Sequence, residues 1–190
     1  MFNFDANKAK KADGGNHITE SGYYASLTIK ECLVSNGTEN TQFCEFNFED
    51  DMGRQLNFVS VLIRQKDGKE AYGMAKIHAL MGLLRLQNVS SVPVTIDKFG
   101  RQVTVEKIPA IIGKQIGVII QRENKPEGKF SMNLLHFIGQ DGRTYSEMAD
   151  NKPALAVTRK VEDKGTPSQK SQGGFGSSYA PPLDDENMPF

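Results

Sequence analysis

Residues 42–64 read QFCEFNFEDDMGRQLNFVSVLIR, and the alternation within this stretch decides the fold class. Cysteine and phenylalanine occupy positions 44, 46 and 48, and the positions between them are mostly polar. A period of two residues is typical of a β-strand with one buried face. Residues 50–54 have the composition of a turn and separate a strand at 42–49 from one at 55–64. The sequence therefore predicts an antiparallel hairpin here.

The flanking segments extend this hairpin into a larger β-structure. Residues 22–34 are rich in aromatic and β-branched side chains and predict a preceding strand, in which Ala25, Leu27, Ile29 and Leu33 share one face. Apolar residues then recur at helical spacing over 71–87, which predicts a helix. Residues 92–107 predict a hairpin with its turn at 98–101. Further strands are expected at 116–121, 130–138 and 143–146.

The order of these elements indicates one architecture. Three strands, a helix and two strands follow one another as in the OB fold, a five-stranded barrel whose helix lies between its third and fourth strands. The hairpin at 92–107 is then an insertion between that helix and the fourth strand. We therefore expect an all-β fold with one main helix. An open sheet with a helix packed on it is the alternative.

Composition limits the class of protein. The 190 residues include 23 basic and 23 acidic side chains, and 38% are hydrophobic, which suits one globular domain with some surplus chain. Residues 163–190 contain two basic and four acidic residues, a formal charge of −2, which leaves +2 on the rest. A mildly basic body with an acidic tail is consistent with nucleic-acid binding.

Other classes find little support in the sequence. The apolar stretches are far shorter than the roughly 20 residues that a bilayer requires, and the start lacks the apolar core of a secretory signal. The two cysteines, Cys32 and Cys44, cannot form a disulfide framework. His17, His78 and His136 lack metal-ligand spacing, and no nucleophile or phosphate-loop motif is found. We therefore expect an intracellular, cytoplasmic protein that is not an enzyme and has no cofactor, metal or membrane association.

The chain divides into four predicted parts. Residues 1–15 form a short arm with three lysines, and residues 16–160 form the barrel domain. Residues 161–183 are rich in Gly, Ser, Gln and Pro, a composition that predicts a flexible linker because it buries too little area to offset chain entropy. Residues 184–190, DDENMPF, form an acidic tip that ends in apolar residues.

The chemistry of this tip suits a docking peptide. Phe190 carries both an aromatic ring and the α-carboxylate, so a pocket can bury the ring while a basic side chain holds the carboxylate. Pro189 stiffens the approach, which lowers the entropy lost on binding. The acidic residues steer the peptide towards a basic rim. The candidate protein-recruiting residues are Asp184, Asp185, Glu186, Met188, Pro189 and Phe190.

The tip resembles the C-terminal peptide of bacterial single-stranded DNA-binding proteins, which is acidic and ends in an apolar residue, Pro and Phe. Asn187 and Met188 depart from that pattern. The body lacks the Trp residues of the bacterial family and is more similar to phage-encoded single-stranded DNA-binding proteins. That similarity lies at residues 2–5 (FNFD), 21–24 (SGYY), 75–84 and 112–118 (IGKQIGV). The resemblance implies recruitment of host or phage replication, recombination and repair proteins by the tip.

Single-strand binders combine cations for phosphates with flat side chains for bases. The sequence 98–101 (KFGR) places a ring between two cations at a predicted turn, and a second basic cluster with an aromatic residue follows at 122–130. Tyr24 and Phe43 are predicted on the polar faces of their strands, although Glu45 and Glu49 share the face of Phe43. The candidate nucleic-acid-binding residues are Tyr24, Lys30, Phe43, Arg54, Arg64, Lys66, Lys98, Phe99, Arg101, Arg122, Lys125, Lys129 and Phe130.

The sequence thus predicts a non-catalytic, sequence-independent single-stranded DNA-binding protein of phage replication or recombination, with a tip that recruits partner proteins. A homo-oligomer is compatible with this prediction. The alternative is an adaptor that uses the same barrel for protein contacts and does not bind nucleic acid.

Overall fold

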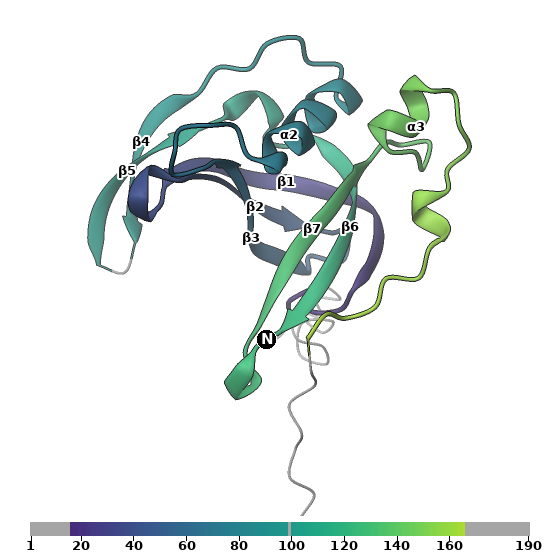
Figure 1. Cartoon of the computed structure of the whole chain (residues 1–190), viewed down its shortest axis with the longest axis horizontal. Coiled ribbons are helices and arrows are strands. Elements are labelled where there is room, and N and C mark those ends of the chain that lie inside the picture. The colour runs from purple at the N-terminus through teal and green to yellow at the C-terminus, as the bar shows by residue number, and fades with distance from the viewer. Residues whose placement is uncertain (1–15, 99, 166–190) are drawn as a thin grey trace, which may run out of the picture.

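A computed structural model describes residues 16–98 and 100–165 (Figure 1). Three antiparallel strands open the domain: β1 (Gly22–Asn36), β2 (Gln42–Glu49) and β3 (Gln55–Arg64). β1 is long and strongly curved (Figure 1). Its C-terminal half pairs with β2, and its N-terminal half pairs with β6 (Gln115–Asn124). One strand therefore belongs to both halves of the sheet.

The sheet has the strand order of the predicted barrel. β6 pairs with β7 (Phe130–Ile138), which gives the path β3-β2-β1-β6-β7. β7 lies close to β3, although in the described part of the chain it forms backbone pairs only with β6. The N-terminal segment helps to close this side, because Ile18 N–H donates to Gln55 O and Gln55 N–H donates to Asn16 O. The predicted all-β, OB-type fold with one main helix is thus confirmed.

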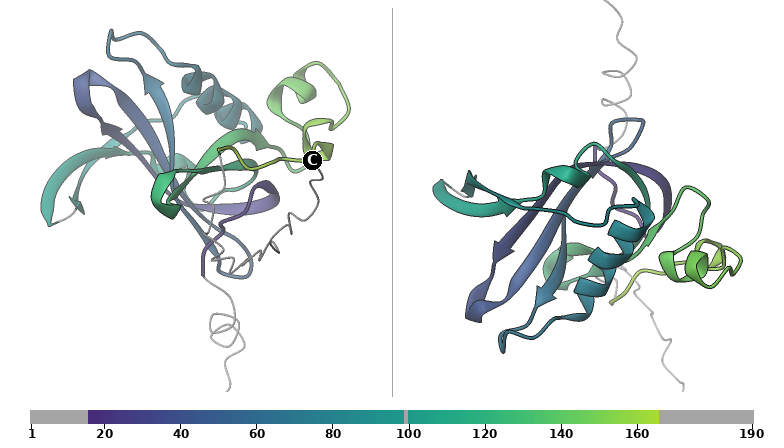
Figure 2. Two further views of the ribbon diagram at one scale, coloured as in Figure 1. Left: turned by 60° about the horizontal axis from the view of Figure 1, so that its bottom comes forward. Right: turned by 90° about the horizontal axis from the view of Figure 1, so that it is seen from above.

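The main helix and the inserted hairpin also form where the sequence predicted them. α2 (Tyr72–Leu83) connects β3 to the hairpin of β4 (Val92–Lys98) and β5 (Arg101–Lys107). The hairpin joins β1 through β5 and projects from the side of the barrel opposite α3 (Tyr145–Ala149), as Figures 1 and 2 show. Short 3-10 turns lie at Thr38–Asn40, Pro109–Ile111, Pro126–Gly128 and Ala156–Thr158.

The strand predicted at 143–146 is wrong, because helix α3 begins there. Thr144 is its N-cap, and its hydroxyl accepts from the Glu147 backbone N–H at 3.2 Å. The Glu147 carboxylate in turn accepts from Thr144 N–H at 2.9 Å. This capping box satisfies the backbone N–H groups of Thr144 and Glu147 within the helix itself. In a strand, such groups would need a neighbouring strand as their partner. Burial acts to raise the pKa of Glu147, but its backbone hydrogen bonds outweigh burial and lower that pKa.

The ordered chain continues beyond the predicted start of the linker at residue 161. Lys164 N–H donates to Arg122 O, and Asn124 N–H donates to Lys164 O, each at 2.8 Å. Ser21 Oγ also donates to the Asp163 carboxylate at 2.6 Å. Residues 162–164 therefore lie beside β6, next to the point where β1 begins.

β-Bulges change which side chains of β1 face inward. Register shifts occur between Tyr24 and Leu27 and between Ile29 and Glu31. As a result Leu27, Ile29 and Cys32 all enter the same core, although Cys32 lies on the opposite face in a regular strand. The predicted shared face of Ala25, Leu27, Ile29 and Leu33 is therefore wrong for Ala25, which is exposed, and for Leu33. Leu33 is buried, but it lies beside Lys107 of the hairpin and outside the core cluster.

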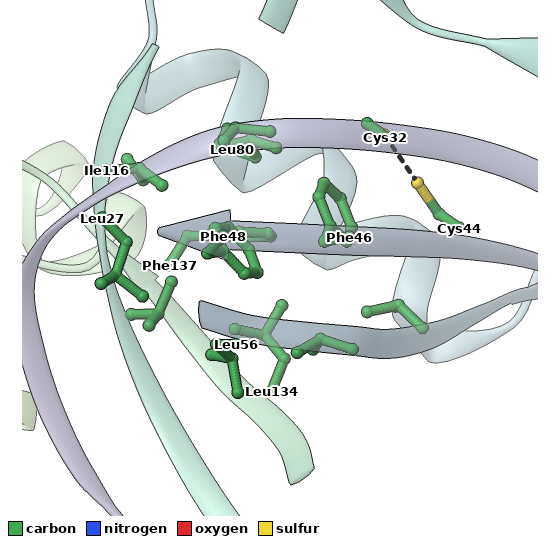
Figure 3. Close-up of a cluster of buried hydrophobic side chains, with 14 of the residues drawn as sticks. Leu27, Cys32, Cys44, Phe46, Phe48, Leu56, Leu80, Ile116, Leu134 and Phe137 are labelled. Carbon is green, nitrogen blue, oxygen red and sulfur yellow. Dashed lines mark hydrogen bonds between the residues drawn. The ribbon is translucent and has the colours of Figure 1, made fainter. Parts of the chain in front are cut away.

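The core fills the barrel with residues from every barrel strand and from α2. Phe46 stacks on Phe48 with ring centroids 5.6 Å apart and meets Phe137 edge to face at 5.5 Å (Figure 3). Cys32 and Cys44 are buried free thiols whose sulfur atoms lie 3.3 Å apart. The hydrogen bond with Cys32, together with burial, raises the pKa of Cys44, so the Cys44 thiol stays protonated and acts as a packing residue.

We expect Gly73→Ala to destabilise the domain. A Cβ at this position meets the carbonyl oxygen of Leu62 and lies 2.5 Å from Val61 Cγ1, so α2 has to move away from β3. Alanine improves helix propensity by about 1 kcal/mol, but the overlap costs more. We predict a net loss of about 1–3 kcal/mol in urea unfolding. His78→Ala, at an exposed position of the same helix, is the control and is expected to be neutral or slightly stabilising. Equal stability of the two variants would contradict the close packing of α2 on β3.

Candidate nucleic-acid interface

The outer face of β3 carries an exposed aromatic ring that is not among the predicted binding residues. Outward positions on this strand are Phe58, Ser60, Leu62 and Arg64, all exposed, and they alternate with buried Val59, Val61 and Ile63. Phe58 has 79% of its surface exposed. A phenylalanine in that position contributes little to the core and offers a flat apolar surface to a ligand.

A β-bulge holds Phe58 outward in a strained conformation. The pairing of β2 with β3 shifts between Phe46 and Phe48, so Asn57 and Phe58 together oppose Asn47. Phe58 has φ +58°, a left-handed value that is unfavourable for a bulky side chain. The Asn47 side chain stabilises the bulge, because its oxygen accepts from Phe58 N–H at 2.8 Å. Strain of this kind at an exposed aromatic residue is a feature of functional sites.

A cavity of about 400 Å³ lies beside Phe58 on the β2 side and includes Lys30 in its lining. The nearby carboxylates of this face each have a partner. Glu49 lies 3.3 Å from Lys30 Nζ, and Glu31 accepts from the Asn47 amide at 2.8 Å. Glu45 lies 3.4 Å from Lys98 Nζ and accepts from Ser35 Oγ at 3.0 Å. Lysines thus offset the charge of Glu45 and Glu49, whereas the partner of Glu31 is a neutral amide.

Tyr24 and Arg54 are both engaged within the fold. Tyr24 is half-buried against the core, contrary to its predicted place on a polar face, because the bulge after it turns the strand. Its hydroxyl donates to Glu20 O at 2.9 Å, and burial raises its pKa. Arg54 Nε donates to the Asp50 carboxylate at 2.8 Å and so closes the turn between β2 and β3.

Phe43, Arg64 and Lys66 gather around the turn between β1 and β2. Phe43 is half-buried, and its ring lies against Gly37, where a Cβ would come within 2.7 Å of it. Arg64 and Lys66 line a polar cavity of about 490 Å³ together with residues of that turn. Lys66 also lies 3.8 Å from the Glu39 carboxylate, with both groups exposed.

The tip of the β4–β5 hairpin reaches towards β2. Lys98 forms the ion pair with Glu45, and Arg101 is exposed. Lys98 and Arg101 are cross-strand neighbours in the hairpin. Their surroundings differ, because the Lys98 side chain contacts β2 and the Arg101 side chain faces solvent. Phe99, the ring predicted to lie between them, is outside the described residues.

The predicted cluster at 122–130 forms in part. The Arg122 guanidinium lies 4.3 Å from the centroid of the Phe130 ring, and Phe130 is 40% exposed. Arg122 also donates to Asn124 and to Thr19 O, which fixes its orientation. Lys129 pairs with Glu127 at 2.9 Å, and Lys125 is exposed.

The structure thus unites Lys30 with Phe58, Arg64 with Lys66, and Arg122 with Phe130, in three separate places. The tip residues 184–190 and the basic arm 1–15 lie outside the described residues. The sequence contains no clear hint of Phe58, because regular alternation over 55–64 would place it on the same face as Leu56 and Leu62. The left-handed bulge that exposes it leaves no recognisable signal in the sequence.

No protein-family model and no curated protein matches the chain. Among the described residues, no helix is both long and apolar enough to cross a membrane.

We expect Phe58→Gly to stabilise the domain. Glycine adopts φ +58° without steric cost, so relief of the strain adds about 1 kcal/mol to the free energy of unfolding. The loss of a ring that is already 79% exposed offsets little of this gain. Thermal and urea unfolding measure the change, with Phe58→Ala as the reference because alanine keeps most of the strain. A Phe58→Gly variant less stable than Phe58→Ala would contradict the strained bulge.

Proposed function

We propose that this protein binds single-stranded DNA without sequence preference and that its C-terminal tip recruits replication or recombination proteins. The observation that carries the proposal is Phe58, which is 79% exposed and held in a strained conformation on the outer face of β3. An aromatic ring presented in this way provides a stacking surface that any base can use. The strand-2 and strand-3 face is also where OB folds bind oligonucleotides.

The surroundings of Phe58 support the same proposal. Lys30 lines the adjoining cavity, and Arg64 extends the exposed row of β3. The amide side chains of Gln55 and Asn57 line the same cavity and can bond to sugar or base edges. The resemblance of the body to phage-encoded single-stranded DNA-binding proteins points to the replication and recombination of phage DNA.

A salt titration tests this proposal. Fluorescence anisotropy of labelled oligo-dT is measured with the full chain over a range of salt concentrations. A single-strand binder loses affinity with a log–log slope of about −0.7 for each phosphate neutralised. A duplex of mixed sequence is the control and is expected to bind more weakly. Absence of oligo-dT binding even at low salt would contradict the proposal and favour the adaptor alternative.

The role assigned to the tip predicts a separation of activities. A chain that ends at residue 183 lacks the acidic residues that can compete with DNA for the basic body. We expect its affinity for oligo-dT to equal or exceed that of the full chain, while partner recruitment is lost. Loss of DNA binding on truncation would place the DNA-binding determinant in the tip and contradict this assignment.

A further inference from the structure

A trough free of carboxylates begins at the outer face of β3. One cavity, of about 380 Å³, lies between β3, the start of α2 and β7. A second, of about 300 Å³, lies between α2, β7 and α3. Tyr72, Lys76 and Leu135 line both, so the two cavities adjoin and are called here the β3–β7 trough. Ser60 and Leu62 open it towards the row that contains Phe58.

Two exposed tyrosines lie along this trough. Tyr72 is 81% exposed at the first position of α2, and Tyr145 is 42% exposed at the first position of α3. Tyr72 is held in place because Gly73 beside it packs directly against the Leu62 backbone. The Tyr145 ring rests on Gly82 of α2. The Tyr145 ring is therefore held against α2, whereas the Tyr72 ring projects into solvent from a backbone that packs on β3.

The charge of the trough suits a polyanion. Its described lining residues include Lys76 and Lys164 but no aspartate or glutamate. Lys76 donates to Leu134 O at 2.6 Å, and its Nζ lies 5.8 Å from the centroid of the Tyr72 ring. Within the described residues, no carboxylate pairs with Lys76. Lys164 lies 3.3 Å from Glu123, which itself lies outside the lining.

The β2 side of β3 differs in this respect. Its cavity includes Glu31 and Glu49 in the lining, beside Lys30. A phosphate therefore meets carboxylates in that direction and only cations and neutral groups in the direction of Tyr72. The trough thus offers two flat rings with a cation between them. Single-strand binding sites combine the same groups, aromatic rings for the bases and cations for the phosphates.

We propose that a bound single strand continues from Phe58 into the β3–β7 trough, with bases stacked on Tyr72 and Tyr145 and a phosphate at Lys76. This inference rests on the proposed function and extends it. It assigns the path of the bound DNA across the barrel. It also predicts a longer binding site than the β3 face alone provides.

Oligonucleotides of graded length test the inference. Oligo-dT of about 4 to about 16 nucleotides spans the site sizes of single OB folds. For the shortest oligomers that bind, Tyr72→Ala is expected to match the unaltered chain. For the longest it is expected to bind about 5- to 150-fold more weakly, the range measured for loss of one stacked base. Tyr72→Phe retains the ring and is expected to bind like the unaltered chain at every length.

Two further variants define the outcomes. Lys76→Gln is expected to reduce the salt slope with long oligomers by about 0.7, as for one phosphate contact. Leu155→Ala, at an exposed residue outside the trough, is the control and is expected to change nothing. Thermal unfolding shows that each variant is folded.

The results separate the two proposals. If the unaltered chain binds no oligo-dT, the proposed function and the trough both fail. If it binds, but Tyr72→Ala matches it at every length and Lys76→Gln leaves the slope unchanged, only the trough assignment is overturned. A protein ligand for the trough would give that second result.

Discussion

Phe58→Ala is expected to weaken oligo-dT binding by about 5- to 150-fold, the range found when one aromatic stacking partner of a base is removed. The ring is 79% exposed, so its loss leaves the core intact. Alanine also keeps most of the backbone strain at φ +58°, which separates the effect on binding from a change in the bulge. Fluorescence anisotropy at fixed, low salt measures the affinity.

The control for this prediction is Leu155→Ala, which removes an apolar side chain that is also exposed, from the segment after α3. It is expected to retain full affinity. Weakening by both variants to the same extent would indicate a nonspecific loss of folded protein. Unchanged affinity of Phe58→Ala would remove the observation that carries the proposed function.

Phe46→Ala is expected to lower the free energy of unfolding by about 3–5 kcal/mol. Phe46 is fully buried and contacts the Phe48 and Phe137 rings, so its removal leaves a cavity between β2 and β7 (Figure 3). Globular domains have total stabilities of about 5–15 kcal/mol, so this loss is a large fraction of the whole. Urea unfolding followed by circular dichroism measures it.

Phe58→Ala is the matched control for stability, because it makes the same substitution one strand away at an exposed position. Its free energy of unfolding is expected to change by no more than about 0.5 kcal/mol. Phe46→Ala is thus expected to lower stability strongly, whereas Phe58→Ala is expected to weaken binding and leave stability almost unchanged. A Phe46→Ala variant as stable as Phe58→Ala would contradict the barrel core described here.

Much of the fold could be predicted because local periodicity reports burial directly. The alternation at 44, 46 and 48 identified β2, and helical spacing identified α2 within a few residues of its bounds. The bulges in β1 could not be predicted, because an extra residue disrupts the alternation without a characteristic sequence. Helix α3 was missed although Thr144 and Glu147 have the spacing of a capping box.

The candidate site was harder to predict than the fold. Arg54 and Lys98 carry the charge that phosphate binding requires, but Arg54 pairs with Asp50 in its own turn and Lys98 pairs with Glu45 of β2. Phe58 and Tyr72 differ from core aromatics only in the direction of their side chains. That direction depends on a bulge in one case and on the docking of α2 in the other.

Photo-crosslinking tests the central claim most directly. Oligo-dT that carries 5-iododeoxyuridine is irradiated in complex with the full chain, and the crosslinked peptides are identified by mass spectrometry. Binding across the outer face of β3 predicts crosslinks at Phe58 and, with longer oligomers, at Tyr72. Crosslinks confined to the β4–β5 hairpin or to the loop between β6 and β7, with β3 unmodified, would contradict it.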